Sequence, residues 1–210
     1  MKTLNRDELF TVALNLDLPD LLRFCSTSKN IATQICRKND IWIYKLKKDF
    51  PEFKKLNLEK TFKELYELLY SLTKVKNELK IKENIYDIYK LKELNVPNKQ
   101  LTSIPKELSS LINLEKLWLS FNNLTSIPKE IGSLINLKEL RLSGNKLTSI
   151  PKELANLINL KILTLSNNQL ISIPKELANS INLKTLSLSN NRLISIPKEL
   201  TDNKNIEIYT

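Results

Sequence analysis

The C-terminal half of the chain is built from five near-identical units of 23 residues, and this period limits the folds open to it. The third unit reads LKELRLSGNKLTSIPKELANLIN, and the others match it in most columns. The units begin at Leu91, Leu114, Leu137, Leu160 and Leu183. A fixed period of this length predicts a stack of similar supersecondary units, each contacting its neighbours.

Each unit opens with a strand pattern. Leu140 and Leu142 alternate around Arg141, and this period of two is typical of a short strand. An asparagine follows in four units: Asn122, Asn145, Asn168 and Asn191. A buried amide at this point can bond backbone groups that are left unpaired as the chain turns off the strand.

The second half of each unit predicts a helical turn that begins at a proline, Pro151 in the third unit. The expected core of that unit consists of Leu137, Leu140, Leu142, Leu147, Ile150, Leu154, Leu157 and Ile158. Burying so few side chains cannot offset the entropy lost on ordering a whole unit, so the units must stack.

The opening L-x-x-L-x-L-x-x-N-x-L resembles the leucine-rich repeat family. The resemblance implies an α/β fold, a right-handed solenoid with a curved parallel sheet, whose asparagines stack into a ladder. It also implies that variable residues on the concave strand face bind partners.

The exposed strand columns are most distinctive in the second and third units. We predict a partner-binding site from Trp118, Phe121, Arg141, Glu139 and Lys116. Trp and Arg are the residue types most enriched in binding hot spots, and Gly144 is expected to leave space beside Phe121. The alternative is that Trp118 only covers Arg141 by cation–π stacking on an unused surface.

Residues 1–50 follow a different, helical pattern. Asn5 and Glu8 are spaced as a capping box, and Asp17 can cap a second helix with Pro19 in its first turn. A third helical segment is expected around 31–35, and a fourth from Asn39 or Asp40.

This stretch resembles an F-box. The matching positions are Leu4, Asp7-Glu8-Leu9-Phe10, Leu16-Asp17, Asp20-Leu21-Leu22 and Trp42, whereas Asn5 stands where the family has proline. The resemblance implies docking on a Skp-family adaptor through Leu4, Leu9, Leu16 and Leu21, weakened by the missing proline. An F-box followed by repeats is similar to the substrate receptors of cullin–RING ubiquitin ligases, and the composition is similar to that of F-box/repeat proteins of large DNA viruses.

The expected organisation is an F-box-like domain over 1–50, a linking helix and cap over 51–80, and the solenoid over 81–210, beginning with a degenerate half repeat. Leucines and a phenylalanine between Leu58 and Leu72 form an apolar stripe at helical spacing. This stripe is predicted to pack within the chain rather than to form a coiled coil.

Charge and residue types exclude several functions. The net charge of +10 is spread, with 18 basic and 13 acidic side chains in 1–90 and 15 and 10 in 91–210, so no basic face for nucleic acid is expected. The chain has no histidine and only two glycines, so we expect no enzyme activity, cofactor or metal site. Cys25 and Cys36 are expected to be free thiols in a reducing compartment.

These observations favour a non-catalytic interaction module: a cytoplasmic, monomeric ligase receptor without membrane contact, in host cytoplasm if viral. Two alternatives remain open. The chain could be a stand-alone repeat protein with a helical cap, or a binder of nucleic acid or acidic surfaces through its positive charge, whose affinity would fall steeply with salt.

Overall fold

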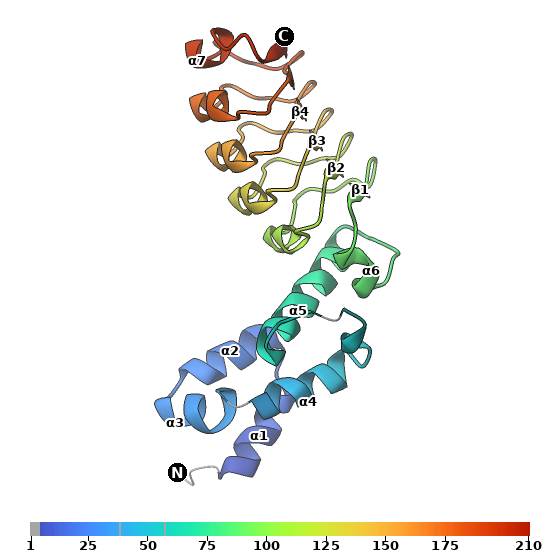
Figure 1. Cartoon of the computed structure of the whole chain (residues 1–210), viewed down its shortest axis with the longest axis vertical. Coiled ribbons are helices and arrows are strands. Elements are labelled where there is room, and N and C mark those ends of the chain that lie inside the picture. The colour runs from blue at the N-terminus through green and yellow to red at the C-terminus, as the bar shows by residue number, and fades with distance from the viewer. Residues whose placement is uncertain (1–4, 38, 57) are drawn as a thin grey trace. The chain divides into compact units, whose positions relative to one another are not determined.

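The computed structural model describes residues 5–37, 39–56 and 58–210. The chain forms two compact units, Met1–Ser71 and Leu72–Thr210 (Figure 1).

The second unit is a solenoid with one sheet along one side and short helical turns along the other (Figure 1). Its strands are β1 (Glu93–Asn95), β2 (Lys116–Trp118), β3 (Glu139–Arg141), β4 (Ile162–Thr164), β5 (Thr185–Ser187) and β6 (Glu207–Tyr209). All neighbours pair in parallel and in chain order, with Leu117 opposite Leu140 and Leu140 opposite Leu163. The predicted parallel sheet is confirmed for the five units, and β6 adds a sixth strand to it.

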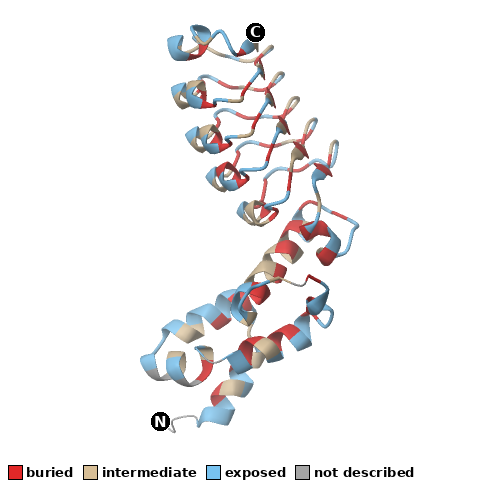
Figure 2. Cartoon of the chain, in the orientation of Figure 1, coloured by how far each residue is buried: buried red, intermediate tan, exposed pale blue. Residues whose placement is uncertain are grey.

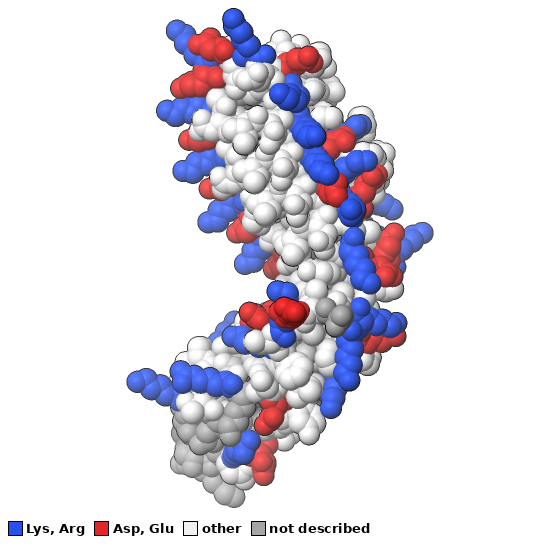
Figure 3. Space-filling model, viewed as in Figure 1, with Lys and Arg blue, Asp and Glu red and all other residues white. Residues whose placement is uncertain are grey.

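The return segments are short helices that begin just after the repeated prolines. They are η3 (Lys106–Ser110), η4 (Lys129–Ser133), η5 (Lys152–Asn156), η6 (Lys175–Asn179) and α7 (Lys198–Thr201), and a short helix, α6 (Ile85–Tyr89), precedes the sheet. Pro151 stands at the N-cap of η5, as expected from its fixed φ. The paired Lys and Glu side chains that follow each proline project along this side of the solenoid (Figure 3).

The solenoid core is a set of leucine rows. In the third unit Leu140, Leu142 and Leu154 are buried, and Figure 2 shows the same pattern along the stack. The prediction that Ile158 belongs to this core is wrong. The chain leaves the helical turn at Leu157, so the next side chain points to solvent, and Ile158 is exposed.

The predicted asparagine ladder is confirmed. The Asn145 amide nitrogen donates to the Leu119 and Leu142 carbonyls at 3.0 and 2.9 Å, and its oxygen accepts from the Leu124 amide at 3.1 Å. Each asparagine of the row therefore joins two neighbouring units where the backbone turns off the strand.

The first unit contains a small helical bundle. Its elements are α1 (Arg6–Asn15), α2 (Leu18–Ser26), α3 (Lys29–Ile31), the π-helix η1 (Ala32–Cys36), α4 (Asn39–Asp49) and η2 (Phe53–Leu56). Asn5 and Glu8 form the predicted capping box, and Asp17 caps α2. The third predicted segment is a single α-turn that continues as π-helix.

The expectation of two free thiols is wrong. Cys25 of α2 and Cys36 of η1 form a disulfide that closes an 11-residue separation. Both cysteines lie in apolar-rich stretches, where sequence cannot distinguish a buried thiol from a bridge. The inference of a reducing compartment loses its premise, because disulfides persist in oxidising environments.

A buried lysine stabilises this bundle. The side chain of Lys45 is only 4% exposed, and its Nζ donates to the carbonyl of Leu16, the C-cap of α1, at 2.9 Å. The same Nζ pairs with Asp49 at 2.7 Å, and Asp49 accepts from the Tyr66 hydroxyl at 2.6 Å. Burial and the Asp49 contact raise the pKa of Tyr66 well above its usual range.

The predicted linking helix is α5 (Phe62–Glu78), which begins later and ends later than its apolar stripe indicates. Thr61 and Glu64 cap its start, so Leu58 lies outside the helix. Leu69 and Leu72 are fully buried, so the stripe packs within the chain as predicted.

Candidate functional site

The ends of strands β2 and β3 place the predicted site residues side by side on the strand face. Trp118 pairs in register with Arg141 across the parallel sheet. Parallel strands lie about 4.8 Å apart, so the two side chains project from adjacent positions. Phe121 follows on the turn after β2 and is 62% exposed. We call Trp118, Phe121 and Arg141 the concave cluster.

Two cations lie close to the Trp118 ring. The Arg141 guanidinium carbon is 4.9 Å from the ring centroid and the Lys116 Nζ is 5.5 Å from it. The cation–π stacking proposed as the alternative is therefore present. The indole nitrogen of Trp118 is buried and has no hydrogen-bond acceptor among the described residues.

Two acids hold the cations in place. Glu139 accepts from Nε of Arg141, and Glu93 of the preceding strand pairs with Lys116 at 3.2 Å. In the described part of the chain no acceptor bonds the terminal guanidinium nitrogens of Arg141. Because a guanidinium carries five N–H groups, Arg141 can still bind a carbonyl or carboxylate of a partner. The sequence did not single out Glu93 as part of this network.

Phe121 has an unusual backbone for a bulky side chain. Its φ is +57°, in the left-handed region that side chains with a Cβ avoid at a cost of roughly 1–2 kcal/mol. The other four members of this column are residues that tolerate it: Asn98, Gly144, Asn167 and Asn190. The Asn and Gly pattern was the sequence signal for this backbone. The left-handed backbone at Phe121 therefore lowers the stability of the fold. Because most of the ring stays in solvent, hydrophobic burial offsets little of this cost.

The expected space beside Phe121 does not exist. A Cβ placed on Gly144 would lie 2.6 Å from Cδ1 of the Phe121 ring, so the ring itself covers this glycine. Because Gly144 has no Cβ, one edge of the Phe121 ring can pack closely against the neighbouring turn. The concave cluster thus presents a raised aromatic edge rather than a notch.

The structure buries two of the four leucines predicted to bind an adaptor. Leu9 and Leu21 are buried in the bundle's own core, so they cannot form a docking surface. Leu16 is half-buried beside the Lys45 contact, and Leu4 lies outside the described residues. Helical periodicity identifies apolar positions, but it does not separate the side that packs from the side that binds.

Two further observations concern metal ligands and membrane spans in the described residues. None of them gather as three or more His, Cys, Asp or Glu side chains that could hold a metal ion. No helix in the described ranges is long and apolar enough to cross a bilayer.

Comparison with known proteins identifies the repeats. The leucine rich repeat family model matches residues 89–147 and 135–193, together half of the chain. The chain belongs to the leucine-rich repeat family. A search of the curated proteins finds no significant match.

Solved leucine-rich repeat structures are similar to this one. The plant peptide hormone receptor RGFR1 in complex with RGF2 is 35% identical over 55% of this chain and 20% of its own, with a TM-score of 0.50. The ectodomain of the Arabidopsis thaliana receptor kinase GASSHO1/SCHENGEN3, in complex with CASPARIAN STRIP INTEGRITY FACTOR 2, is 33% identical over 57% and 15%, with a TM-score of 0.51. A Leptospira interrogans leucine-rich repeat protein is 32% identical over 62% and 45%, with a TM-score of 0.44. The chain spans less than half the length of each.

Proposed function

We propose that this leucine-rich repeat protein captures a protein segment on the concave cluster. The observation that carries the proposal is Phe121, an exposed aromatic side chain on a left-handed backbone. Such strain persists where function offsets its cost. The two similar receptor structures, solved with RGF2 and with CASPARIAN STRIP INTEGRITY FACTOR 2, support a protein partner.

The chemistry of the cluster favours a particular kind of segment. Trp118 and Phe121 supply apolar area at low entropic cost, and Arg141 supplies donors for a carboxylate or a backbone carbonyl. Since Glu139 already bonds one edge of the guanidinium, Arg141 is held in a fixed position before binding. We therefore expect a short segment that carries an apolar side chain next to an acid or a chain terminus.

Affinity capture from the native host lysate tests this proposal. A Trp118→Ala, Arg141→Ala double variant should lose the captured partner, since a hot-spot residue contributes at least about 2 kcal/mol, or roughly thirtyfold in affinity. The matched control is Thr164→Ala, Ser187→Ala, which truncates the same column two strands further along. Equal capture by wild type and double variant, with both folded by circular dichroism, would place the site elsewhere.

A second candidate function is the substrate receptor of a Skp–cullin–F-box ligase, in which the first unit docks an adaptor. The ordered F-box-like pattern and the four helical segments of the bundle favour it. The Cys25–Cys36 disulfide counts against it, because the adaptor works in a reducing compartment. With Leu9 and Leu21 buried, the docking surface must use exposed apolar side chains, of which Tyr44 is the largest in the bundle.

Size-exclusion chromatography of the full chain with a Skp-family adaptor tests the second candidate. Co-elution that is lost in Tyr44→Asp and kept in Lys152→Glu supports it. If the folded wild type does not co-elute at about 100 μM adaptor, its Kd is far weaker than that of specific complexes. The ligase function would then be contradicted.

A further inference from the structure

A second surface, away from the concave cluster, follows from the segment that links each helical turn to the next strand. It reads Ile-Asn-Leu-Lys in three successive units, ending at Lys138, Lys161 and Lys184. The leucine enters the core, while the other three side chains form rows along one edge of the solenoid. The isoleucine row consists of Ile112, Ile135, Ile158 and Ile181, and the lysine row of Lys92, Lys138, Lys161 and Lys184.

The isoleucine row is an exposed apolar stripe held in place by amides. Its side chains are 48 to 77% exposed. The amide nitrogen of Asn136 donates to the Ile112 carbonyl at 2.8 Å, and Asn182 donates to the Ile158 carbonyl at 2.7 Å. These bonds fix the backbone that carries the isoleucines, so a partner would meet an ordered apolar surface.

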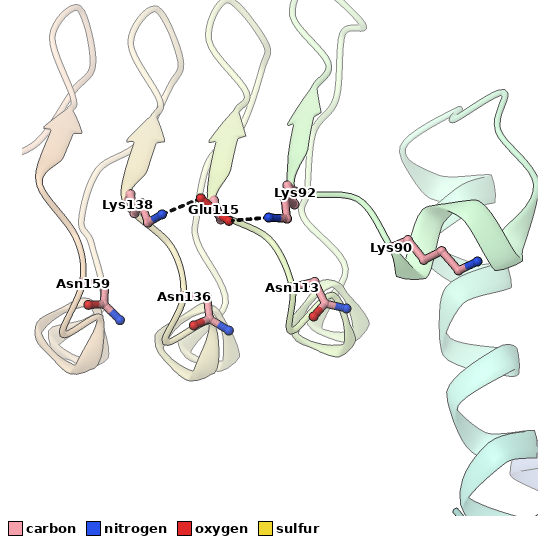
Figure 4. Close-up of a pocket in the computed structure, with 7 residues that line it drawn as sticks. All are labelled: Lys90, Lys92, Asn113, Glu115, Asn136, Lys138 and Asn159. Carbon is pink, nitrogen blue, oxygen red and sulfur yellow. Dashed lines mark hydrogen bonds and ion pairs between the residues drawn. The ribbon is translucent and has the colours of Figure 1, made fainter. Parts of the chain in front are cut away.

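The positive charge of the lysine row is neutralised by an ion-paired glutamate at one end only. Glu115 stands in its column between the first two lysines and pairs with Lys92 at 3.3 Å and with Lys138 at 2.5 Å (Figure 4). These contacts lower the pKa of Glu115. Beyond it, Lys161 and Lys184 have no ion pair with any described carboxylate. Like charges on neighbouring strands repel, so this end of the row favours an anionic partner.

A groove lies between the lysines and the asparagines. Its volume is about 520 Å³, and it lies at the end of the row that holds Glu115, with Lys92, Lys138 and three asparagines in its walls (Figure 4). Neither the isoleucines nor Lys161 and Lys184 line this groove, so the docking edge is defined by the exposed isoleucine row and the unpaired end of the lysine row rather than by the groove.

We propose that this edge docks an acidic amphipathic helix of a partner protein. One lysine and one isoleucine recur per repeat, and parallel strands lie about 4.8 Å apart. A helix presents one apolar and one acidic position per turn at about 5.4 Å. Over three intervals the 5.4 Å spacing of the helix departs from the 4.8 Å spacing of the strands by about 2 Å in total. An extended strand places same-face side chains about 6.6 Å apart, so over the same three intervals it departs by about 5 Å. The helix therefore matches the lysine row, which directly precedes the strands, better than an extended segment does, and the isoleucine row recurs once per unit beside it.

A synthetic helical peptide of about 18 residues, five turns, serves as the probe. It carries leucines at helical spacing and glutamates along one flank. Fluorescence anisotropy of the labelled peptide on the full chain measures its Kd. A scrambled peptide of the same composition and vesicles of phosphatidylserine and phosphatidylcholine are the comparison ligands.

The decisive variant is Lys161→Glu, Lys184→Glu, and the matched control is Lys152→Glu, Lys175→Glu, the same charge change on the helical turns of two units. The proposal expects the peptide to bind at least about tenfold more weakly to the first variant and unchanged to the control, a difference of about 1.4 kcal/mol. Ile158→Ser, Ile181→Ser should weaken binding similarly. The proposal is overturned if the control variant loses as much peptide affinity as the Lys161→Glu, Lys184→Glu variant, or if the scrambled peptide binds as tightly as the designed one. It is also overturned if the chain binds the vesicles but not the peptide.

Discussion

Replacing Asn145 by alanine should destabilise the solenoid by a calculable amount. The side chain makes three buried hydrogen bonds, one accepted from the Leu124 amide and two donated to the carbonyls of Leu119 and Leu142. Both carbonyls keep a second amide donor, from the asparagines of the neighbouring units. Only the Leu124 N–H loses its partner. The loss of two ordinary bonds at about 1 kcal/mol each and one unsatisfied buried donor at about 1–3 kcal/mol gives roughly 3–5 kcal/mol.

Urea denaturation followed by far-ultraviolet circular dichroism measures the free energy of unfolding. The hydrogen-exchange rate of the Leu124 amide should rise in the variant, because this N–H loses its acceptor. Asn136→Ala is the matched control: it removes one exposed amide contact from the same stack. The control should cost less than about 1 kcal/mol. An Asn145→Ala loss no larger than that of the control, with an unchanged Leu124 exchange rate, would refute the ladder reasoning.

Three further predictions follow from single interactions. Phe121→Asn should raise the stability by about 1 kcal/mol, because Asn tolerates the left-handed backbone, while it weakens partner capture; a destabilised variant in urea melts would contradict this. Burial is the largest single influence on the pKa of Glu107 and raises it, but the 2.8 Å bond from Lys74, a backbone hydrogen bond and the charges of Lys74 and Lys106 together leave the pKa lowered. The stabilising contribution is therefore present above the ordinary value of 4.5 and lost as the pH falls through the folded-state pKa. Thermal melts of wild type and Glu107→Gln should therefore differ at pH 7 and converge as the pH falls below 4.5. Reducing the Cys25–Cys36 bridge should cost the first unit about 2–4 kcal/mol, visible as faster hydrogen exchange in α2; unchanged exchange would mean that the bridge contributes nothing.

The solenoid was predictable because each of its features repeats. Leucines at a period of two, prolines at the start of each helical turn and a column of asparagines all occur five or nearly five times, and the structure confirms them. Ile158 was misplaced because the expected helical face continued past Leu157, whereas the backbone turns there. A local change of direction leaves no mark in a hydrophobic pattern.

The candidate site was predictable in its residues but not in its shape. The neighbouring positions of Trp118 and Arg141 followed from the repeat register, and so did the stacking between them. The contact between Phe121 and Gly144 did not follow, because it depends on a left-handed backbone that only the Asn and Gly of the other units signal. In the first unit, apolar positions could be found, but which of them face inward depends on how the helices pack.

Photocrosslinking tests the central claim, that the concave cluster holds a protein partner, most directly. Benzoyl-phenylalanine at position 121 replaces one aromatic ring by another, and the same group in place of Lys152 on the helical turns is the control. After irradiation in host lysate, the account predicts one adduct from position 121, none from position 152, and loss of the adduct in an Arg141→Ala background. Adducts of the same protein from both positions, or an adduct from position 121 that survives Arg141→Ala, would contradict it.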